Sequence, residues 1–337
     1  MNFGDKIIAL YDTLTDLGKK SNISVKYRVL ETPNFQTKVP VLFGNFPWYY
    51  RLITHGSGIF LSKENSFFLS VAPNWKMGEN DFLENKYIIV RPEININNIA
   101  DFVEFVKSLR ENTQTPLLIK QVSEEVYDIL LQNGFRQYTE SENWDESSKY
   151  DDQTFPEVIL RTSEYVSNNY ARGSIKEKVN AGEFFIEKCD LSDKENQELA
   201  KEYIFHIFYD WLKHFRKRHP DAINKNFVQW NLETFDAMIS DETLIVLFVK
   251  NKAGKPIGVF SLTETLPHCQ FDIVFSFVSE FEGNFQRVAY DMLISWMHEK
   301  HQCAYLNLGG SELQSLFEFK KSLGNHIELK TYHLIYE

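Results

Sequence analysis

A glycine turn near residue 309 carries the residue types and spacing best suited to chemistry in this sequence. The segment reads Tyr305-Leu306-Asn307-Leu308-Gly309-Gly310-Ser311-Glu312. It predicts a buried strand that enters a Gly-Gly turn, and the turn then opens a helix. Because the first backbone N–H groups of a helix have no partner within it, they are free to hold a carbonyl oxygen or an anion. A turn of this kind can support acyl transfer.

Carboxylates near this turn are candidates for general base catalysis. Glu312 begins the predicted helix, and Asp272 and Glu264 lie on or beside the predicted central strands. A carboxylate in a cleft between strands can have a raised pKa and deprotonate an acceptor amine. Glu312 equally fits an ordinary acid in a first helical turn, where it favours the helix dipole. A base is also unnecessary if the amine arrives neutral.

The elements that must position these groups occur in the same order in both halves of the chain. Each half predicts strand, helix, strand, helix and strand, starting near residue 86 and near residue 271. From Phe285 to Met297 apolar residues recur at i, i+3, i+4, i+7 and i+8, as a helix with one buried face requires. A hairpin over 243–263 precedes this core, and one continuous strand over 327–336 closes it.

An acidic stretch separates the two halves. It has little apolar periodicity and contains Glu140, Glu142, Asp145, Glu146, Asp151, Asp152 and Glu157. We therefore expect two domains, 1–150 and 151–337, of an α+β class with mixed central sheets flanked by helices. A long helix over 192–215 precedes the hairpin over 243–263. Helices, a hairpin, and then alternating strands and helices is the order of the GNAT acyltransferase fold, so the chain resembles a tandem GNAT protein.

Composition limits the class of protein. A chain of 337 residues has room for two domains, and 43% hydrophobic residues indicate packed cores rather than disorder. Three widely spaced cysteines argue against a disulfide framework. No apolar run reaches the roughly 20 residues of a membrane span, and the first residues lack a basic signal region, so we expect a cytoplasmic protein. Because the net charge is −11, a nucleic acid would need a local basic surface.

The second half also resembles a family. Gly283-Asn284, the segment 305–312 and Phe317-Glu318-Phe319-Lys320-Lys321 are similar to the catalytic domain of the phosphatidylglycerol lysyltransferases and, more loosely, to the FemABX aminoacyl-tRNA-dependent transferases. The resemblance covers roughly 160 residues, and the first half matches only by element order. It implies transfer of an aminoacyl group from a charged tRNA to an amine or hydroxyl. The acceptor would be a small molecule, a peptide or a lipid headgroup.

The resemblance also implies roles for individual residues. A lysine near the final helix helps to stabilise the tetrahedral oxyanion, and Lys320 matches it. A solvated lysine on an amphipathic helix is the alternative interpretation. The predicted catalytic residues are Lys320, Glu312 and Asn307, and the predicted substrate-binding residues are Gly309, Gly310, Ser311, Asn284, Arg287 and Lys321.

A basic stretch is the predicted contact for tRNA phosphates. It contains Lys213, Arg216, Lys217 and Arg218, with Trp211 and Phe215 as apolar anchors. A basic helix end favoured by the helix dipole is the alternative explanation. A second basic cluster of Arg172, Lys176 and Lys178 loosely matches a basic segment near the start of the family's second domain.

Two other functions stay open. A CoA-dependent N-acyltransferase would wrap the pyrophosphate with Q/R-x-x-G-x-G/A, but residues 280–285 read Glu-Phe-Glu-Gly-Asn-Phe, with two acids and one matching glycine. This disfavours acetyl-CoA or another acyl-CoA as the donor. A tandem GNAT-like module that only binds a partner is the third possibility. His298, His301 and Cys303 have no evident fourth ligand, so we expect no metal site and no cofactor.

Overall fold

The structure is a computed structural model of the chain. It describes residues 3–27, 59–73, 87–138, 155–164, 174–218, 244–266, 268–279, 285–311 and 313–337, together with residues 228, 231, 232, 235 and 239. The chain divides into two units: Met1–Ser148 with Lys330–Glu337 form unit 1, and Lys149–Leu329 form unit 2. Each unit is built on a mixed seven-stranded sheet, so the predicted α+β class is confirmed.

Unit 1 has the strand order β1-β2-β3-β4-β5-β14-β6. Only β4 and β5 run parallel, and the other neighbours are antiparallel. Its elements are α1 (Phe3–Ser21), β1 (Ser24–Tyr27), β2 (Ile59–Lys63), β3 (Phe67–Pro73), β4 (Ile88–Ile94), η2 (Ile96–Asn98), α3 (Ile99–Thr113), β5 (Leu117–Val122), α4 (Glu124–Gln132), β6 (Arg136–Gln137) and β14 (Tyr332–Tyr336).

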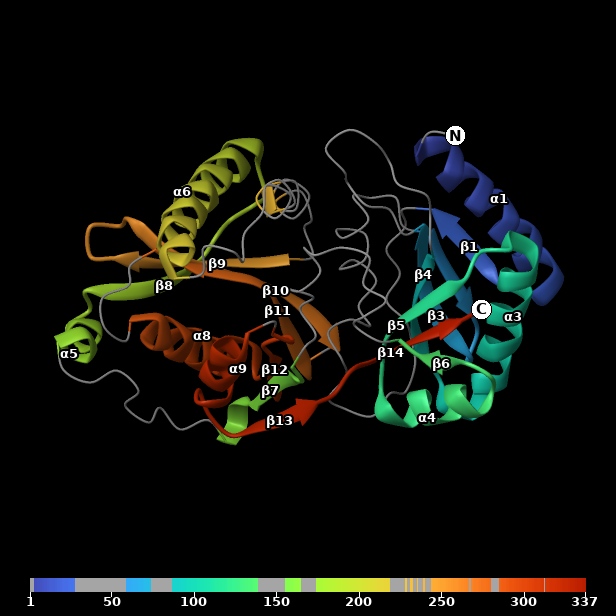
Figure 1. The fold of residues 1–337 in the computed structure, drawn as a ribbon. Helices are drawn as coiled ribbons and strands as arrows, with labels where there is room; N and C mark the ends of the chain where they lie inside the picture. Colours follow the sequence, from blue (N-terminus) through green and yellow to red (C-terminus); the bar gives the residue numbers. More distant parts are fainter. Residues whose placement is uncertain are drawn as a thin grey trace. The chain divides into compact units, whose positions relative to one another are not determined.

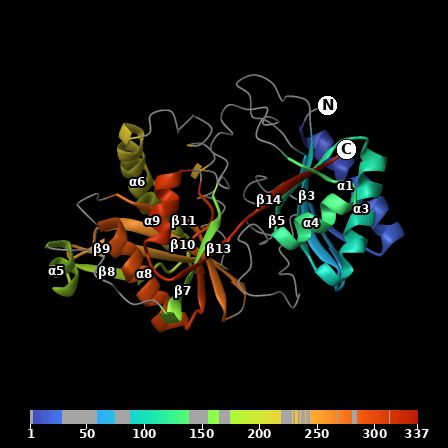
Figure 2. The same cartoon turned by 60° about the horizontal axis from the view of Figure 1, so that its bottom comes forward.

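The core of unit 1 lies between the sheet and the helices α1 and α3, which lie side by side on one face (Figures 1 and 2). The buried residues of α3 recur with the spacing of an amphipathic helix: Phe102, Val103, Phe105, Val106 and Leu109. The helix ends at Gln114, which has a left-handed φ of 54° and donates its N–H to the oxygen of Arg110.

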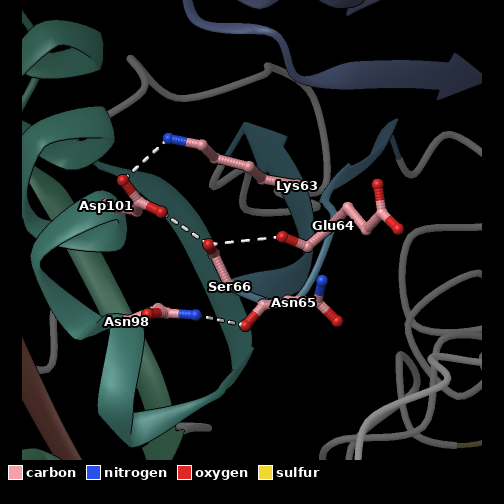
Figure 3. A network of polar contacts seen from close by, with 6 residues as sticks. All are labelled: Lys63, Glu64, Asn65, Ser66, Asn98 and Asp101. Carbon is pink, nitrogen blue, oxygen red and sulfur yellow. Dashed lines mark hydrogen bonds and ion pairs between the residues drawn. The ribbon is translucent and has the colours of Figure 1, made fainter.

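A polar clamp joins the β2–β3 hairpin to the start of α3 (Figure 3). The carboxylate of Asp101 accepts from Lys63 Nζ at 2.7 Å and from Ser66 Oγ at 2.5 Å. These two donors hold the pKa of Asp101 below its ordinary value. The side chain of Asn98 donates to the backbone oxygen of Asn65 at 2.8 Å. The clamp fixes the hairpin against the helix, and it contains none of the predicted site residues.

Unit 2 has the strand order β13-β7-β12-β11-β10-β9-β8. Here β11 and β12 form the parallel pair. Its elements are β7 (Glu157–Arg161), η5 (Thr162–Glu164), α5 (Ser174–Asn180), β8 (Phe184–Lys188), α6 (Lys194–Arg218), β9 (Leu244–Asn251), β10 (Pro256–Leu266), β11 (Gln270–Val278), α8 (Phe285–His301), β12 (Tyr305–Asn307), α9 (Gln314–Lys321) and β13 (His326–Leu329).

Helices cover both faces of this sheet, with α8 and α9 on one face and α6 on the other (Figure 1). A bulge at Val274 changes which side chains of β11 point to which face, because Ser261 pairs with Phe275 while Leu262 pairs with Ile273. Before the bulge, Ile273 packs in the core with α8. After it, Phe277 packs on α6, with its ring 5.1 Å from that of Phe208.

The predicted strand over 327–336 is wrong as a single element. It is two strands, β13 and β14, and they belong to different sheets. In unit 2, β13 pairs with β7, whereas in unit 1 β14 lies between β5 and β6. The alternating apolar pattern runs through both strands, and a pattern of period two does not encode which sheet a strand joins.

The observed division therefore differs from domains 1–150 and 151–337. Residues 330–337 belong to unit 1, and the division between the halves falls after Ser148. The chain passes from one sheet to the other twice. After β6 of unit 1, it enters unit 2 as β7, which lies between β12 and β13. After β13 of unit 2, it returns to unit 1 as β14, which lies between β5 and β6. Among the described residues, no helix is long and apolar enough to span a membrane.

Candidate active site

The glycine turn follows the point where two parallel strands stop pairing. Residues 270–272 of β11 pair with residues 305–307 of β12, and β11 then continues to Val278 paired only with β10. Gly309 has a φ of 70°, a left-handed conformation that glycine adopts without strain. After β12 the chain thus stops pairing with β11, while Leu308, Gly309 and Ser311 remain hydrogen-bonded to residues 155–158 on the other side.

Lys320 lies against this turn. Its Nζ donates to the oxygen of Gly309 at 3.2 Å and to the oxygen of Gly310 at 2.5 Å, and the residue is only 7% exposed. The alternative of a solvated lysine on the outer face of the helix is therefore wrong. The helix itself begins at Gln314, later than the predicted start at Ser311. The carbonyl oxygens of Gly309 and Gly310 therefore precede the helix, and they accept from the ammonium group of Lys320. Glu312 lies outside the described residues.

Ser311 adds a hydroxyl to the turn. Its backbone oxygen accepts from Phe155 N at 3.0 Å, which fixes the residue to the segment before β7. Its Oγ is buried and makes no hydrogen bond in the structure. Leaving a buried hydroxyl without a partner costs about 1–3 kcal/mol, and such groups are often found at functional sites. Ser311 is thus a suitable donor for a ligand at the turn.

A chain of buried polar groups lies on the sheet beside the turn. Asn307 donates from Nδ2 to Glu157 Oε2 at 2.8 Å, and its Oδ1 accepts from Gly309 N at 2.8 Å. Next to it, Asp272 accepts from Thr265 Oγ1 at 2.6 Å and from Gln270 Nε2 at 2.7 Å. Asp272 and Asn307 are paired residues of the parallel strands. Two tethered carboxyl groups thus lie near the turn: Asp272 on β11, and Glu157 on β7, which accepts from Asn307 of β12.

Glu157 belongs to the site although it is not among the predicted site residues. The sequence pattern puts it in the acidic stretch between the halves, but it is the first residue of β7 and is 1% exposed. Its assignment to the acidic stretch is therefore wrong. The signal in the sequence is its position directly before the apolar run Val158-Ile159-Leu160, because an acid that begins a buried strand differs from one in a solvated linker.

Burial raises the pKa of Asp272 to about 8, against the lowering effect of the bonds from Thr265 and Gln270, and the neighbouring Glu157 raises it further. Between about pH 4 and pH 8 the folded state therefore keeps a proton that the unfolded state has lost. We expect the free energy of unfolding to fall as the pH rises through this window, relative to Asp272→Asn, by at most about 1.4 kcal/mol per pH unit. Urea unfolding of both proteins from pH 4.5 to 8.5 measures the difference. A difference that stays constant with pH would contradict this.

Two of the predicted substrate-binding residues lie among α8, α9 and β13. Arg287 donates to Ser322 Oγ, and its guanidinium carbon is 5.8 Å from the centre of the Phe319 ring. Lys321 pairs with Glu328 at 3.0 Å, and this contact raises the pKa of the lysine. These contacts are to α9 and β13, whereas the ammonium group of Lys320 donates to the turn itself. Asn284 lies outside the described residues.

The predicted tRNA contacts lie mainly at the end of α6. Four exposed basic residues form its last turns: Lys213, Arg216, Lys217 and Arg218. The ring of Trp211 stacks on that of Phe215 at 4.8 Å and lies 4.9 Å from Phe277, so the helix end is anchored by aromatic packing. Lys176 and Lys178 lie on α5, where only the side chain of Lys178 is described, and Arg172 lies outside the described residues.

Two of the three residues considered for a metal, His301 and Cys303, have other contacts. The ring of His301 lies 5.1 Å from the rings of Phe271 and Trp296. Cys303 Sγ donates to the oxygen of Tyr305 at 2.9 Å. Within the described part of the chain, no three His, Cys, Asp or Glu residues are grouped so that they could hold a metal ion.

The two units, each with helices packed on a mixed sheet that contains one parallel pair, define a tandem GNAT-like fold. No protein-family model matches the sequence, and no curated protein matches it. Solved structures do resemble the fold. L-PGS from Bacillus licheniformis aligns at a TM-score of 0.57 and 11% identity, over 85% of this chain and 86% of that chain.

FemX aligns at a TM-score of 0.54 and 12% identity, over 92% of this chain and 94% of that one. A conserved protein of unknown function from Bacteroides thetaiotaomicron VPI-5482 aligns at a TM-score of 0.57 and 11% identity, over 86% of this chain and 88% of that chain. The expected resemblance to the lysyltransferase and FemABX proteins is therefore confirmed for the fold, and at these identities for the fold alone.

Proposed function

We propose that this protein is an acyl-group transferase that moves an aminoacyl group from a charged tRNA onto an amine or hydroxyl acceptor. The observation that carries the proposal is the buried ammonium group of Lys320, which donates to Gly309 and Gly310 where β11 and β12 separate. The likeness of the fold to FemX and L-PGS supports the same class of reaction. We also propose a cytoplasmic location, where charged tRNA is available.

In the proposed reaction, the acceptor nitrogen or oxygen forms a bond to the carbonyl carbon of the aminoacyl ester. The carbonyl oxygen becomes negatively charged in the tetrahedral intermediate, and Lys320 supplies a fixed positive charge for it. The intermediate then loses the ribose oxygen of the tRNA, which takes up the proton that the acceptor gives up. An amine that arrives neutral needs no base, and Glu312 is the proposed base for other acceptors.

Purified protein, tRNA charged with radiolabelled amino acids and a panel of amine acceptors test the proposal. We expect product that depends on the protein and disappears when the charged tRNA is first treated with RNase. Product that survives RNase treatment would count against a tRNA donor. Calorimetric titration with acetyl-CoA provides the comparison, because tight binding would favour the CoA-dependent alternative.

The basic end of α6 gives a second prediction. Changing Lys213, Arg216, Lys217 and Arg218 to alanine is expected to raise the KM for charged tRNA about tenfold or more at 0.1 M salt, with little change in kcat, because phosphate contacts are lost. The dependence of KM on salt should also weaken. Kinetics at several salt concentrations measure both effects.

The matched control is another helix with two lysines in its last turn, α1. Changing Lys19 and Lys20 to alanine removes exposed lysines at an equivalent position in a helix and should leave the KM unchanged. An equal effect of both sets of substitutions would indicate a general loss of attraction rather than contact at α6.

A further inference from the structure

The amide of Asn307 is bonded at both of its ends, and both bonds are buried. Its Nδ2 donates to Glu157 on β7, and its Oδ1 accepts the N–H of Gly309, each at 2.8 Å. Asn307 is 0% exposed and Glu157 is 1% exposed. A carboxylate can only accept, so it fixes the nitrogen of the amide toward β7 and the oxygen toward the turn. The orientation in which Asn307 can hold Gly309 is thus set by Glu157.

The neighbouring carboxyl group does not compete for this amide. Asp272 is the strand partner of Asn307, but its two oxygens accept from Thr265 and Gln270. The other end of the turn is held by Lys320, which bonds the oxygens of Gly309 and Gly310. The N–H of Gly309 is therefore bonded to a side chain of β12, and its oxygen to a side chain of α9 and to the N–H of Val158 on β7 at 3.4 Å. Losing the contact at the N–H frees Gly309 to rotate, and this changes the direction of the oxygen that Lys320 contacts.

We propose that Glu157 is a positioning residue for the catalytic turn: it orients Asn307, Asn307 holds the N–H of Gly309, and the turn in consequence presents its carbonyls to Lys320. The inference rests on the proposed function for its effect on catalysis. The orientation of Asn307 and Gly309 stands independently of any activity. The residue acts through others, and β7, which carries it, is the first strand of unit 2 in chain order.

An exchange of roles tests the proposal. Asn307→Asp keeps an acceptor for Gly309 but places a second carboxylate 2.8 Å from Glu157, in the buried position of the amide nitrogen. We expect this variant to lose the turn geometry at a pH where both carboxyl groups are ionised, because like charges repel strongly when they are buried. In the double variant Asn307→Asp with Glu157→Gln, the introduced glutamine can donate to the introduced aspartate. The pair is thereby restored with donor and acceptor exchanged.

The first readout is the amide resonance of Gly309 in protein labelled with ¹⁵N-glycine, which reports the hydrogen bond to residue 307 without any substrate. The resonance should shift in Asn307→Asp and return toward its original position in the double variant. Glu157→Leu, which removes the acceptor without adding a charge, should also shift it. An unchanged resonance in Glu157→Leu overturns the proposal. This variant also decides the question if Asn307→Asp does not fold.

The second readout is the rate of transfer. We expect Asn307→Asp to lower kcat about 100-fold with little change in KM, because a displaced turn weakens the intermediate more than substrate binding. The double variant should regain most of the loss. If the double variant is as slow as Asn307→Asp, the hydrogen bond between residues 157 and 307 does not position the turn, and the proposal is overturned. If the original protein shows no transfer, the proposed function fails, and the resonance of Gly309 still decides the positioning role.

The matched control uses a second Asn–Glu contact on the surface. Asn325 donates from Nδ2 to Glu164, and this contact is exposed. Asn325→Asp makes the same chemical change beside a carboxylate that water screens. It should leave both the Gly309 resonance and kcat as they were. Equal effects of Asn307→Asp and Asn325→Asp would show that the change in charge, rather than the turn, is responsible.

Discussion

Replacing Lys320 with methionine is expected to lower kcat for aminoacyl transfer about 100- to 1,000-fold, with a small change in KM. The reason is that a preorganised positive charge stabilises the tetrahedral intermediate more than the bound substrate. Methionine keeps most of the length and the apolar stem of the side chain, so the packing of α9 is largely retained. Single-turnover kinetics with charged tRNA in excess measure the chemical step.

Lys300→Met is the control, because Lys300 is an exposed lysine in the last turn of α8 and is not among the predicted site residues. It should retain nearly full activity, since substitutions of exposed side chains usually change stability by less than about 0.5 kcal/mol. Thermal unfolding of both variants separates a loss of structure from a loss of catalysis. A folded Lys320→Met protein with unchanged kcat would end the catalytic role of the lysine and favour the binding-module alternative.

Deleting residues 330–337 is expected to unfold unit 1 and to leave unit 2 folded. The deletion removes β14, which lies between β5 and β6. Leu334 and Ile335 are each 0% exposed, and burying such a side chain contributes about 1.5–3 kcal/mol. The ladder of hydrogen bonds to β5 is lost as well. Together these losses are comparable with the whole stability of a domain, about 5–15 kcal/mol.

Hydrogen exchange read by mass spectrometry localises the effect of this deletion. Amides of β4 and β5 should exchange much faster, whereas those of β10 and β11 should stay protected. Glu337→Ala is the control, because it removes the exposed ion pair with Arg136 and keeps the whole of β14. Equal loss of protection in both sheets would contradict the division into units.

Sequence patterns predicted the elements whose signals are local. The hairpin expected over 243–263 is β9 and β10, and the apolar stripe from Phe285 to Met297 is the buried face of α8. Each of these depends on residues close in the chain, since helical spacing and hairpin turns are short-range features. The glycine turn follows from the same kind of signal, whereas the expectation for Lys320 comes from the resemblance to the lysyltransferase and FemABX families.

Features that depend on distant pairing could not be predicted from these patterns. The membership of β14 in the first sheet, and of Glu157 in the second, is decided by registers between strands far apart in sequence. The bulge at Val274 is likewise invisible in an apolar run where both faces are buried. For this reason the sequence indicates Asn307 as a site residue, but it does not show that the carboxylate of Glu157 is the group that orients it.

The placement of β14 has a consequence for synthesis on the ribosome. The ribosome synthesises strands β1 to β6 of the first sheet early. It synthesises β14, which lies between β5 and β6, only after the whole of unit 2. At about 5–20 residues per second, β5 and β6 wait on the order of ten seconds or more with unpaired edges. Exposed edges of this kind invite pairing with other chains. We therefore expect nascent chains to depend on molecular chaperones for the half that is translated first.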